Sequence, residues 1–135
     1  MATDAPAALA SALVRDFVAN AHGDLDFVRA ALEDEPALLN AAWDWGGGDW
    51  ETGLGAAAHM GRRDIAELLL DRGARMDVFA AAMLGEVEIV RAMLDAHPEA
   101  VAAKGPHGIP LRVHAEKGGE QAAAVLALLD ERASR

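Results

Sequence analysis

The segment "GRRDIAELLLDRGA", residues 61–74, decides the fold class of this chain. Glycine breaks regular structure near both of its ends, at Gly61 and Gly73. Between them the apolar residues recur at spacings of three and four, which is the period of one helix face; that face consists of Ile65, Leu68 and Leu69. The segment therefore predicts a short amphipathic helix bounded by turns.

Two further segments align with it, without gaps, on a shared glycine. They are "NAHGDLDFVRAALEDEP" around Gly23 and "AMLGEVEIVRAMLDAHP" around Gly85, and both carry an acidic residue three positions after the glycine and then an apolar residue. The spacing is 38 residues from Gly23 to Gly61, 24 from Gly61 to Gly85 and 33 from Gly85 to Gly118. A period of 33 residues with one insertion and one deletion fits these spacings and predicts a repeat array.

The repeats resemble those of the ankyrin-repeat family. The family's first-helix pattern, Thr-Pro-Leu-His-x-Ala-Ala-x-x-Gly, is similar to "TGLGAAAHMG" at 52–61, where Gly53 and Gly55 replace the proline and the histidine. Its second-helix pattern, Gly-x-x-Glu-Ile-Val-x-x-Leu-Leu-x-x-Gly-Ala, is similar to residues 61–74. The resemblance covers residues 14–132. The 24-residue spacing leaves no room for the family's β-turn finger in the third repeat.

Composition and resemblance together predict an all-α ankyrin-repeat array with almost no sheet. Alanine dominates a 53% hydrophobic content that includes no tyrosine and three phenylalanines, and this favours helix. We expect one domain, 1–135, whose repeats span approximately residues 8–40, 50–76, 77–103 and 107–132. Alanine runs at 56–58 and 80–82 suit close helix contacts, and glycine suits the tight turns at Gly61 and Gly85.

We expect Ile65 and Ile89 to be buried at equivalent positions of the second helices, because each directly follows the acidic residue of its repeat.

The charge of the chain limits its partners. A formal net charge of −10 and a pI near 4.8 disfavour nucleic acid and anionic membranes, which repel an acidic surface. We expect a protein partner with a neutral or basic surface, bound by a monomer. The chain has no cysteine and its first residues do not read as a signal peptide, which favours a cytoplasmic location.

Motifs for catalysis, cofactors and metals are not recognisable in the sequence. The stretch "GGGDWETG" lacks the lysine of a phosphate-binding loop, and the five histidines form no i, i+4 pair or HExxH motif. We therefore expect no catalytic residue, no cofactor and no metal ligand, with histidines exposed or locally hydrogen-bonded. His22 and His59 nevertheless occupy neighbouring positions before their glycines, so stacking can bring them together.

The resemblance implies a partner-binding groove formed by the ends of the first helices and by the finger loops. The residues at these positions are His22, His59, Met60, Met83, Leu84, His107 and Lys117. Met83 and Leu84 have two alternatives: an exposed apolar patch, or burial beneath neighbouring loops in the place of the missing finger.

The stretch "WDWGGGDWETG", residues 43–53, contains all three tryptophans and belongs to the same expected surface. Its three glycines predict a surface loop, and five extra residues allow it to lean across the gap left by the missing finger. Trp43, Trp45 and Trp50 are candidate partner contacts; we expect Trp50 to be the packed ring and Trp45 the exposed one.

The sequence predicts a non-catalytic protein–protein interaction module. One alternative is an acidic inhibitor or immunity-type protein that neutralises a basic partner. Another is a small ligand-binding protein or enzyme that uses the histidines and tryptophans. A flat groove favours the interaction module, whereas a pocket where His59, His107 and a tryptophan converge favours the ligand-binding alternative.

Overall fold

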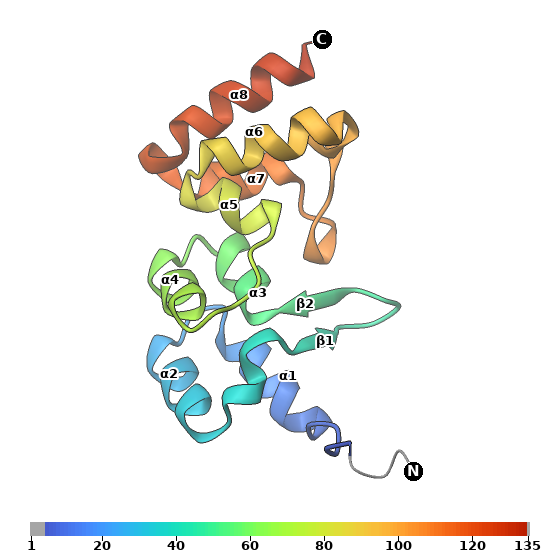
Figure 1. Ribbon diagram of the computed structural model, residues 1–135, viewed down its shortest axis with the longest axis vertical. Coiled ribbons are helices and arrows are strands. Elements are labelled where there is room, and N and C mark those ends of the chain that lie inside the picture. The colour runs from blue at the N-terminus through green and yellow to red at the C-terminus, as the bar shows by residue number, and fades with distance from the viewer. Residues whose placement is uncertain (1–4, 135) are drawn as a thin grey trace.

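The structure, a computed structural model, describes residues 5–134 and is mostly helical, with one small two-stranded sheet (Figure 1). The ends of the expected domain, residues 1–4 and 135, lie outside the described residues. The α-helices are α1 (Ser11–Asn20), α2 (Leu25–Asp34), α3 (Gly53–His59), α4 (Arg63–Asp71), α5 (Val78–Leu84), α6 (Val87–Ala96), α7 (Leu111–Lys117) and α8 (Ala123–Ala133). Shorter 3-10 helices are η2 (Pro36–Asn40), η3 (Pro98–Ala102), η4 (Pro106–Gly108) and η5 (Gly119–Ala122). Within residues 5–134 no helix has the length and apolar character needed to cross a membrane.

The helices are arranged as consecutive pairs. The first members α1, α3, α5 and α7 pack against one another in order, and α3 also contacts α7. Among the second members, α2 packs on α4 and α6 packs on α8. The alanine runs at 56–58 and 80–82 are fully buried, as expected where helices approach closely. The helical character predicted from the sequence is confirmed.

Two glycines form the tight turns that the sequence predicted. Gly61 has φ +66° and Gly85 has φ +80°, a conformation that residues with a side chain rarely adopt. A Cβ atom at Gly85 would also overlap the carbonyl oxygen of Gln121. A Cβ atom at Gly61 would come within 2.8 Å of the carbonyl oxygen of Lys117. Each turn therefore requires glycine both for its backbone angle and for space.

The tryptophan stretch is a β-hairpin, which corrects the expectation of a loop in an all-α chain. Strand β1 (Ala42–Asp44) pairs antiparallel with β2 (Trp50–Thr52), placing Trp43 opposite Glu51. The turn is stabilised by the Asp44 carboxylate, which accepts hydrogen bonds from the backbone N–H groups of Gly46 and Gly48. The extra length of this connection is sufficient for two short strands to pair, and its glycines are exposed as predicted.

A second projection, residues 104–110, lies beside the hairpin and is called the finger below. An isolated antiparallel bridge between Lys104 and Pro110 closes its base. Only residues 72–77 connect α4 to α5, so no projection from that connection separates the finger from the hairpin. Figure 1 shows both projecting from the same side of the helices, and Asp49 of the hairpin hydrogen-bonds to His107 of the finger. The predicted lean of the hairpin across this gap is confirmed.

The buried side chains form two hydrophobic clusters that meet at α5. The first is contributed mainly by residues 14–69 and includes Phe17, Leu54 and Ile65. The second is contributed mainly by residues 81–129 and includes Leu94 and Leu111. Because α5 contributes side chains to both, it joins the two halves of the chain.

Ile65 is fully buried, but Ile89 is 41% exposed, which corrects the expectation that both are core residues. The next position is buried in both helices, at Ala66 and Val90. The difference follows from the neighbours: α4 packs on α2, α3 and α5, whereas α6 turns Val90 and Leu94 toward the second cluster.

Ile65→Ala is expected to lower the free energy of unfolding by roughly 2–5 kcal/mol, because it leaves a cavity in the first cluster. Ile89→Ala is expected to lower it by less than about 1 kcal/mol, because the side chain is already partly solvated. Urea denaturation of both variants measures the difference. Equal losses would contradict the orientation of α6.

Candidate metal centre

The Glu51 carboxylate is buried at the junction of the hairpin, α3 and the finger. Successive residues of a strand face opposite sides, so Trp50 is 61% exposed while Glu51 is 1% exposed. The Thr52 hydroxyl caps α3 by accepting a hydrogen bond from the N–H of Gly55, at 3.0 Å. This cap continues β2 directly into α3 and fixes Glu51 beside the helix.

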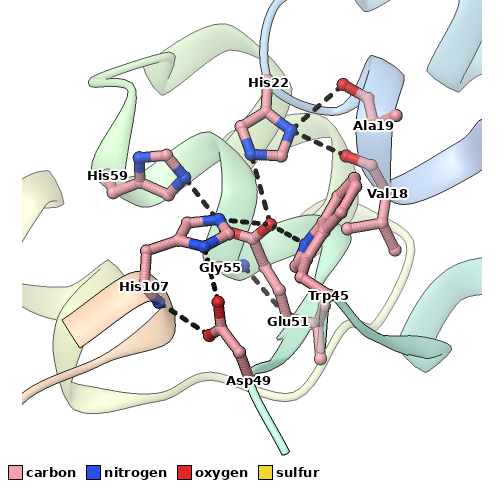
Figure 2. A network of polar contacts seen from close by, with 10 residues as sticks. Val18, Ala19, His22, Trp45, Asp49, Glu51, Gly55, His59 and His107 are labelled. Carbon is pink, nitrogen blue, oxygen red and sulfur yellow. Dashed lines mark hydrogen bonds and ion pairs between the residues drawn. The ribbon is translucent and has the colours of Figure 1, made fainter. Parts of the chain in front are cut away.

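Three imidazoles and one indole direct nitrogen atoms at this carboxylate (Figure 2). The Nε2 atoms of His22 and His107 lie 3.2 and 3.3 Å from Glu51 Oε1, and Nε2 of His59 lies 2.9 Å from Oε2. Trp45 Nε1 donates a hydrogen bond to Oε1 at 2.8 Å. These side chains come from the turn after α1, the last residue of α3, the finger and the hairpin turn.

The opposite ring nitrogens of two histidines are also held. His22 Nδ1 lies 2.9 Å from the carbonyl oxygen of Val18 and 3.0 Å from that of Ala19, and His107 Nδ1 lies 2.7 Å from Asp49 Oδ2. Carbonyl and carboxylate oxygens accept hydrogen bonds, so Nδ1 is the protonated nitrogen of both rings. A neutral ring then presents an Nε2 lone pair to the Glu51 carboxylate, and a proton or a cation is required between them.

The ionisation of these groups follows from the same contacts. Burial alone raises the pKa of Glu51, but the close imidazole nitrogens of His22 and His59 and the hydrogen bond from Trp45 outweigh it and hold this pKa well below its ordinary 4.5. The hydrogen bond to Glu51 raises the pKa of His22 above 6.5 despite partial burial. The backbone N–H of His107 lowers the pKa of Asp49. The carboxylates are therefore ionised, and positive charge between them and the imidazoles is favoured.

One contact in the cluster is close without being a hydrogen bond. Glu51 Oε2 and His59 Nε2 are 2.9 Å apart and both buried, yet within residues 5–134 neither atom has a hydrogen-bond partner of acceptable geometry. Buried polar atoms without partners are uncommon because their desolvation is not offset. A cation bound to both atoms would satisfy them.

The donor atoms are close enough to share one ion. One ligand atom each from His22, Glu51, His59 and His107 lies within 4.8 Å of the others. Tetrahedral coordination with bonds of about 2.1 Å places ligand atoms about 3.4 Å apart. The donor atoms therefore lie at most about 1.4 Å farther apart than the ligands of one tetrahedral ion.

The aromatic rings converge at the same place. The ring centroids of His22 and His59 are 4.9 Å apart, which confirms that stacking brings these two histidines together. His59 and His107 are 5.3 Å apart, and Trp45 is 6.1 Å from both His22 and His107. The rings therefore converge, which is one part of the arrangement expected for a ligand-binding site; the other part was a pocket.

The two remaining histidines stand apart from the cluster. His97 is exposed and lies 3.7 Å from Glu99. His114 is buried against Phe79 and its Nδ1 donates to the carbonyl oxygen of Pro110, while burial lowers its pKa. His97 and His114 are therefore histidines outside the cluster with which its members can be compared.

Several residues expected at a partner surface lie elsewhere. Met83 and Leu84 are 1% and 9% exposed, so they form no exposed patch; they are buried because α5, which carries them, packs between α3 and α7. Met60 and Lys117 are exposed.

The expected roles of two tryptophans were wrong. Trp50 is the most exposed ring, at 61%, whereas Trp45 is 39% exposed and hydrogen-bonded to Glu51. Trp43 packs at the edge of the first cluster. The register of the hairpin sets these orientations, because it turns Glu51 inward and Trp50 outward.

Sequence reasoning did not identify Glu51 or Asp49. Both lie in the tryptophan stretch, and a surface loop gives no reason to bury a carboxylate. The alternation of strand residues was the available signal, but it requires knowing that residues 50–52 form a strand.

Comparison with protein-family models, with curated proteins and with solved structures found no match to this chain. The chemistry of the cluster therefore has to follow from its own donor atoms.

The cluster predicts a pH-dependent stability in the presence of a chelator. The lowered pKa of Glu51 stabilises the folded chain above about pH 4.5, and this contribution is lost as the pH falls. The raised pKa of His22 stabilises the folded chain below about pH 6.5, and this contribution is lost as the pH rises. The loss of unfolding free energy on Glu51→Gln should therefore be largest near about pH 5.5 and smaller at about pH 8. Urea denaturation at both values measures it. A loss that grows from the lower to the higher pH would contradict the assigned ionisation.

Proposed function

We propose that this protein binds one divalent transition-metal ion through the Nε2 atoms of His22, His59 and His107 and the carboxylate of Glu51. The convergence of three imidazole Nε2 atoms on one buried carboxylate carries the proposal. Zinc is the ion that fits best, since structural zinc sites take four nitrogen, sulfur or oxygen ligands in a tetrahedron. Copper and nickel also prefer imidazole, whereas magnesium and calcium require more oxygen ligands.

The charge of the cluster suits a divalent ion. Three neutral imidazoles and one carboxylate leave a single positive charge on a bound M²⁺, and Asp49 beside His107 offsets that charge. Metal binding requires deprotonated Nε2 atoms, so the ion replaces protons that otherwise lie between the rings and Glu51.

Contacts behind the donor atoms support the same proposal. Ligating histidines in metal sites usually donate their other N–H to a carbonyl or carboxylate, which fixes the tautomer and the ring orientation. His22 has this contact with Val18, and His107 has it with Asp49. Trp45 donates to Glu51 Oε1 and leaves Oε2 for the ion.

The proposed role is structural rather than catalytic. Four protein ligands complete a tetrahedral shell and leave no position for a substrate. A cavity of about 490 Å³ lies between α6, η3 and α8, lined by Leu94, Asp95 and Arg132 among others, and it shares no lining residue with the cluster. The proposal replaces the sequence-based expectation of a chain without metal ligands.

We propose that the scaffold of this site is an ankyrin-type repeat array. Three features support this proposal: the helix pairs pack in order, glycine forms the turns at Gly61 and Gly85, and alanines are buried between adjacent helices. In such an array the finger loops vary while the helices are kept, so a metal site can be built between fingers without altering the helical core.

A second candidate function, protein binding, is supported by exposed apolar side chains. Trp50 is 61% exposed and Met60 is 48% exposed, and large exposed side chains of this kind often contact partners. The acidic surface suits a neutral or basic partner, including the target of an inhibitor. Affinity capture from the source cell should lose a specific partner on Trp50→Ala but retain it on Leu13→Ala, which truncates another exposed apolar side chain. Retention by both variants would exclude Trp50 as a contact.

Isothermal titration of chelator-treated protein with zinc is expected to show one bound ion per chain. Loss of an outer-shell partner typically weakens metal binding by roughly 10–100-fold. Glu51→Gln and His59→Ala each remove a ligand, so each should weaken zinc binding by at least this factor. His97→Ala is the matched control and should bind zinc as the wild type does. Weakening by His97→Ala but not by His59→Ala would place the ion elsewhere and contradict the proposal.

A further inference from the structure

The hydrogen bonds between the finger and the hairpin depend on one residue, His107. Within residues 5–134, every hydrogen bond between the finger and the hairpin involves His107. Its backbone N–H and its Nδ1 meet the two carboxylate oxygens of Asp49, at 2.8 and 2.7 Å, and its Nε2 lies 3.3 Å from Glu51 Oε1. The position of the finger tip therefore depends on what His107 binds.

The backbone of His107 is held in an uncommon conformation. Its φ is +61°, and it is the one residue other than glycine with positive φ in the described part of the chain. Such conformations persist where surrounding contacts impose them, and they concentrate at functional sites. Here His107 lies in a turn closed by the N–H of Gly108 on the carbonyl oxygen of Gly105, and its own N–H and ring contact Asp49.

The base of the finger is held independently of the tip. Gly105 N–H donates to the carbonyl oxygen of Ile109 at 2.8 Å, and Leu111 N–H donates to that of Ala103 at 3.0 Å. Gly105 also lies against Phe79 and His114, where even a Cβ atom would be tight. Only the tip, around His107, is free to leave the hairpin.

The four donors come from both halves of the chain. His22, Glu51 and His59 belong to the segment that forms the first hydrophobic cluster, and His107 belongs to the segment that forms the second. An ion bound to all four would cross-link residues that are 85 positions apart, from His22 to His107.

We infer that the bound metal acts as a latch: it fixes the finger tip on the hairpin, and metal loss releases the tip while the helices stay folded. This inference rests on the proposed metal site. The side-chain contact of His107 with Asp49 is about one-third exposed on both sides, and polar contacts that water reaches are weak. Coordination of Nε2 by a metal that is also bound to the buried Glu51 supplies the stronger attachment.

Hydrogen–deuterium exchange of the wild-type chain, with excess zinc and with chelator, tests the latch. We expect zinc to slow exchange in peptides that cover residues 104–110 by about tenfold or more, because it suppresses local opening of the tip. A peptide that covers α2 should exchange at the same rate in both conditions.

His107→Asn provides the matched variant. Asparagine adopts positive φ more readily than most residues and keeps an N–H donor for Asp49, but it has no nitrogen in the place of Nε2. Zinc should still bind this variant through the three remaining ligands, more weakly, and at saturation it should no longer protect the finger.

The outcomes separate the latch from the metal site. If one zinc ion binds the wild type and exchange of the finger is unchanged, the latch is overturned and the metal site stands. If zinc does not bind, both are overturned. If zinc slows exchange of the finger equally in His107→Asn and in the wild type, the latch is also overturned, because the slowing would then not depend on a bond between the metal and Nε2 of His107.

Discussion

The burial of one carboxylate, that of Glu51, is the constraint on which the functional end of this molecule depends. An ionised carboxylate removed from water is strongly unfavourable unless positive charge and hydrogen bonds replace its hydration. Four side chains from separate segments supply these contacts: His22, Trp45, His59 and His107. Because Glu51 needs these contacts, four segments lie close together around its carboxylate: the turn after α1, the hairpin, the end of α3 and the finger.

A shortened connection makes this arrangement possible. Residues 72–77 join α4 to α5 without a projection of their own, so the finger lies directly against the hairpin. Gly55 lies beside both, since a Cβ atom there would be in van der Waals contact with Pro106 of the finger and with the stem of Glu51. The short connection between α4 and α5 thus leaves His107 within reach of Glu51.

Much of the fold was predictable because it depends on local patterns. The three-and-four spacing around Ile65 and the glycines Gly61 and Gly85 specify helices and tight turns within single segments. The exposure of Ile89 was not predictable, because it depends on which neighbours cover α6. The same holds for Met83, whose burial results from the packing of α5 between two other helices.

The candidate site was only partly predictable. Aligned repeats placed His22 beside His59, and the short third repeat allowed the hairpin to lean toward the finger. The inward direction of Glu51 and the outward direction of Trp50 follow from the strand register, which no local pattern in "GGGDWETG" reveals. Histidine spacing along the chain gave no metal motif, because the donors are adjacent only after the repeats stack.

The most direct test of the metal centre is the position of the ion itself. Crystals of the zinc-loaded protein, measured with X-rays at the zinc absorption edge, should show one strong anomalous peak per chain. The account predicts this peak at about 2.0–2.2 Å from the Nε2 atoms of His22, His59 and His107 and from a carboxylate oxygen of Glu51. A peak at His97 or at another surface site, with none among these four residues, would contradict it.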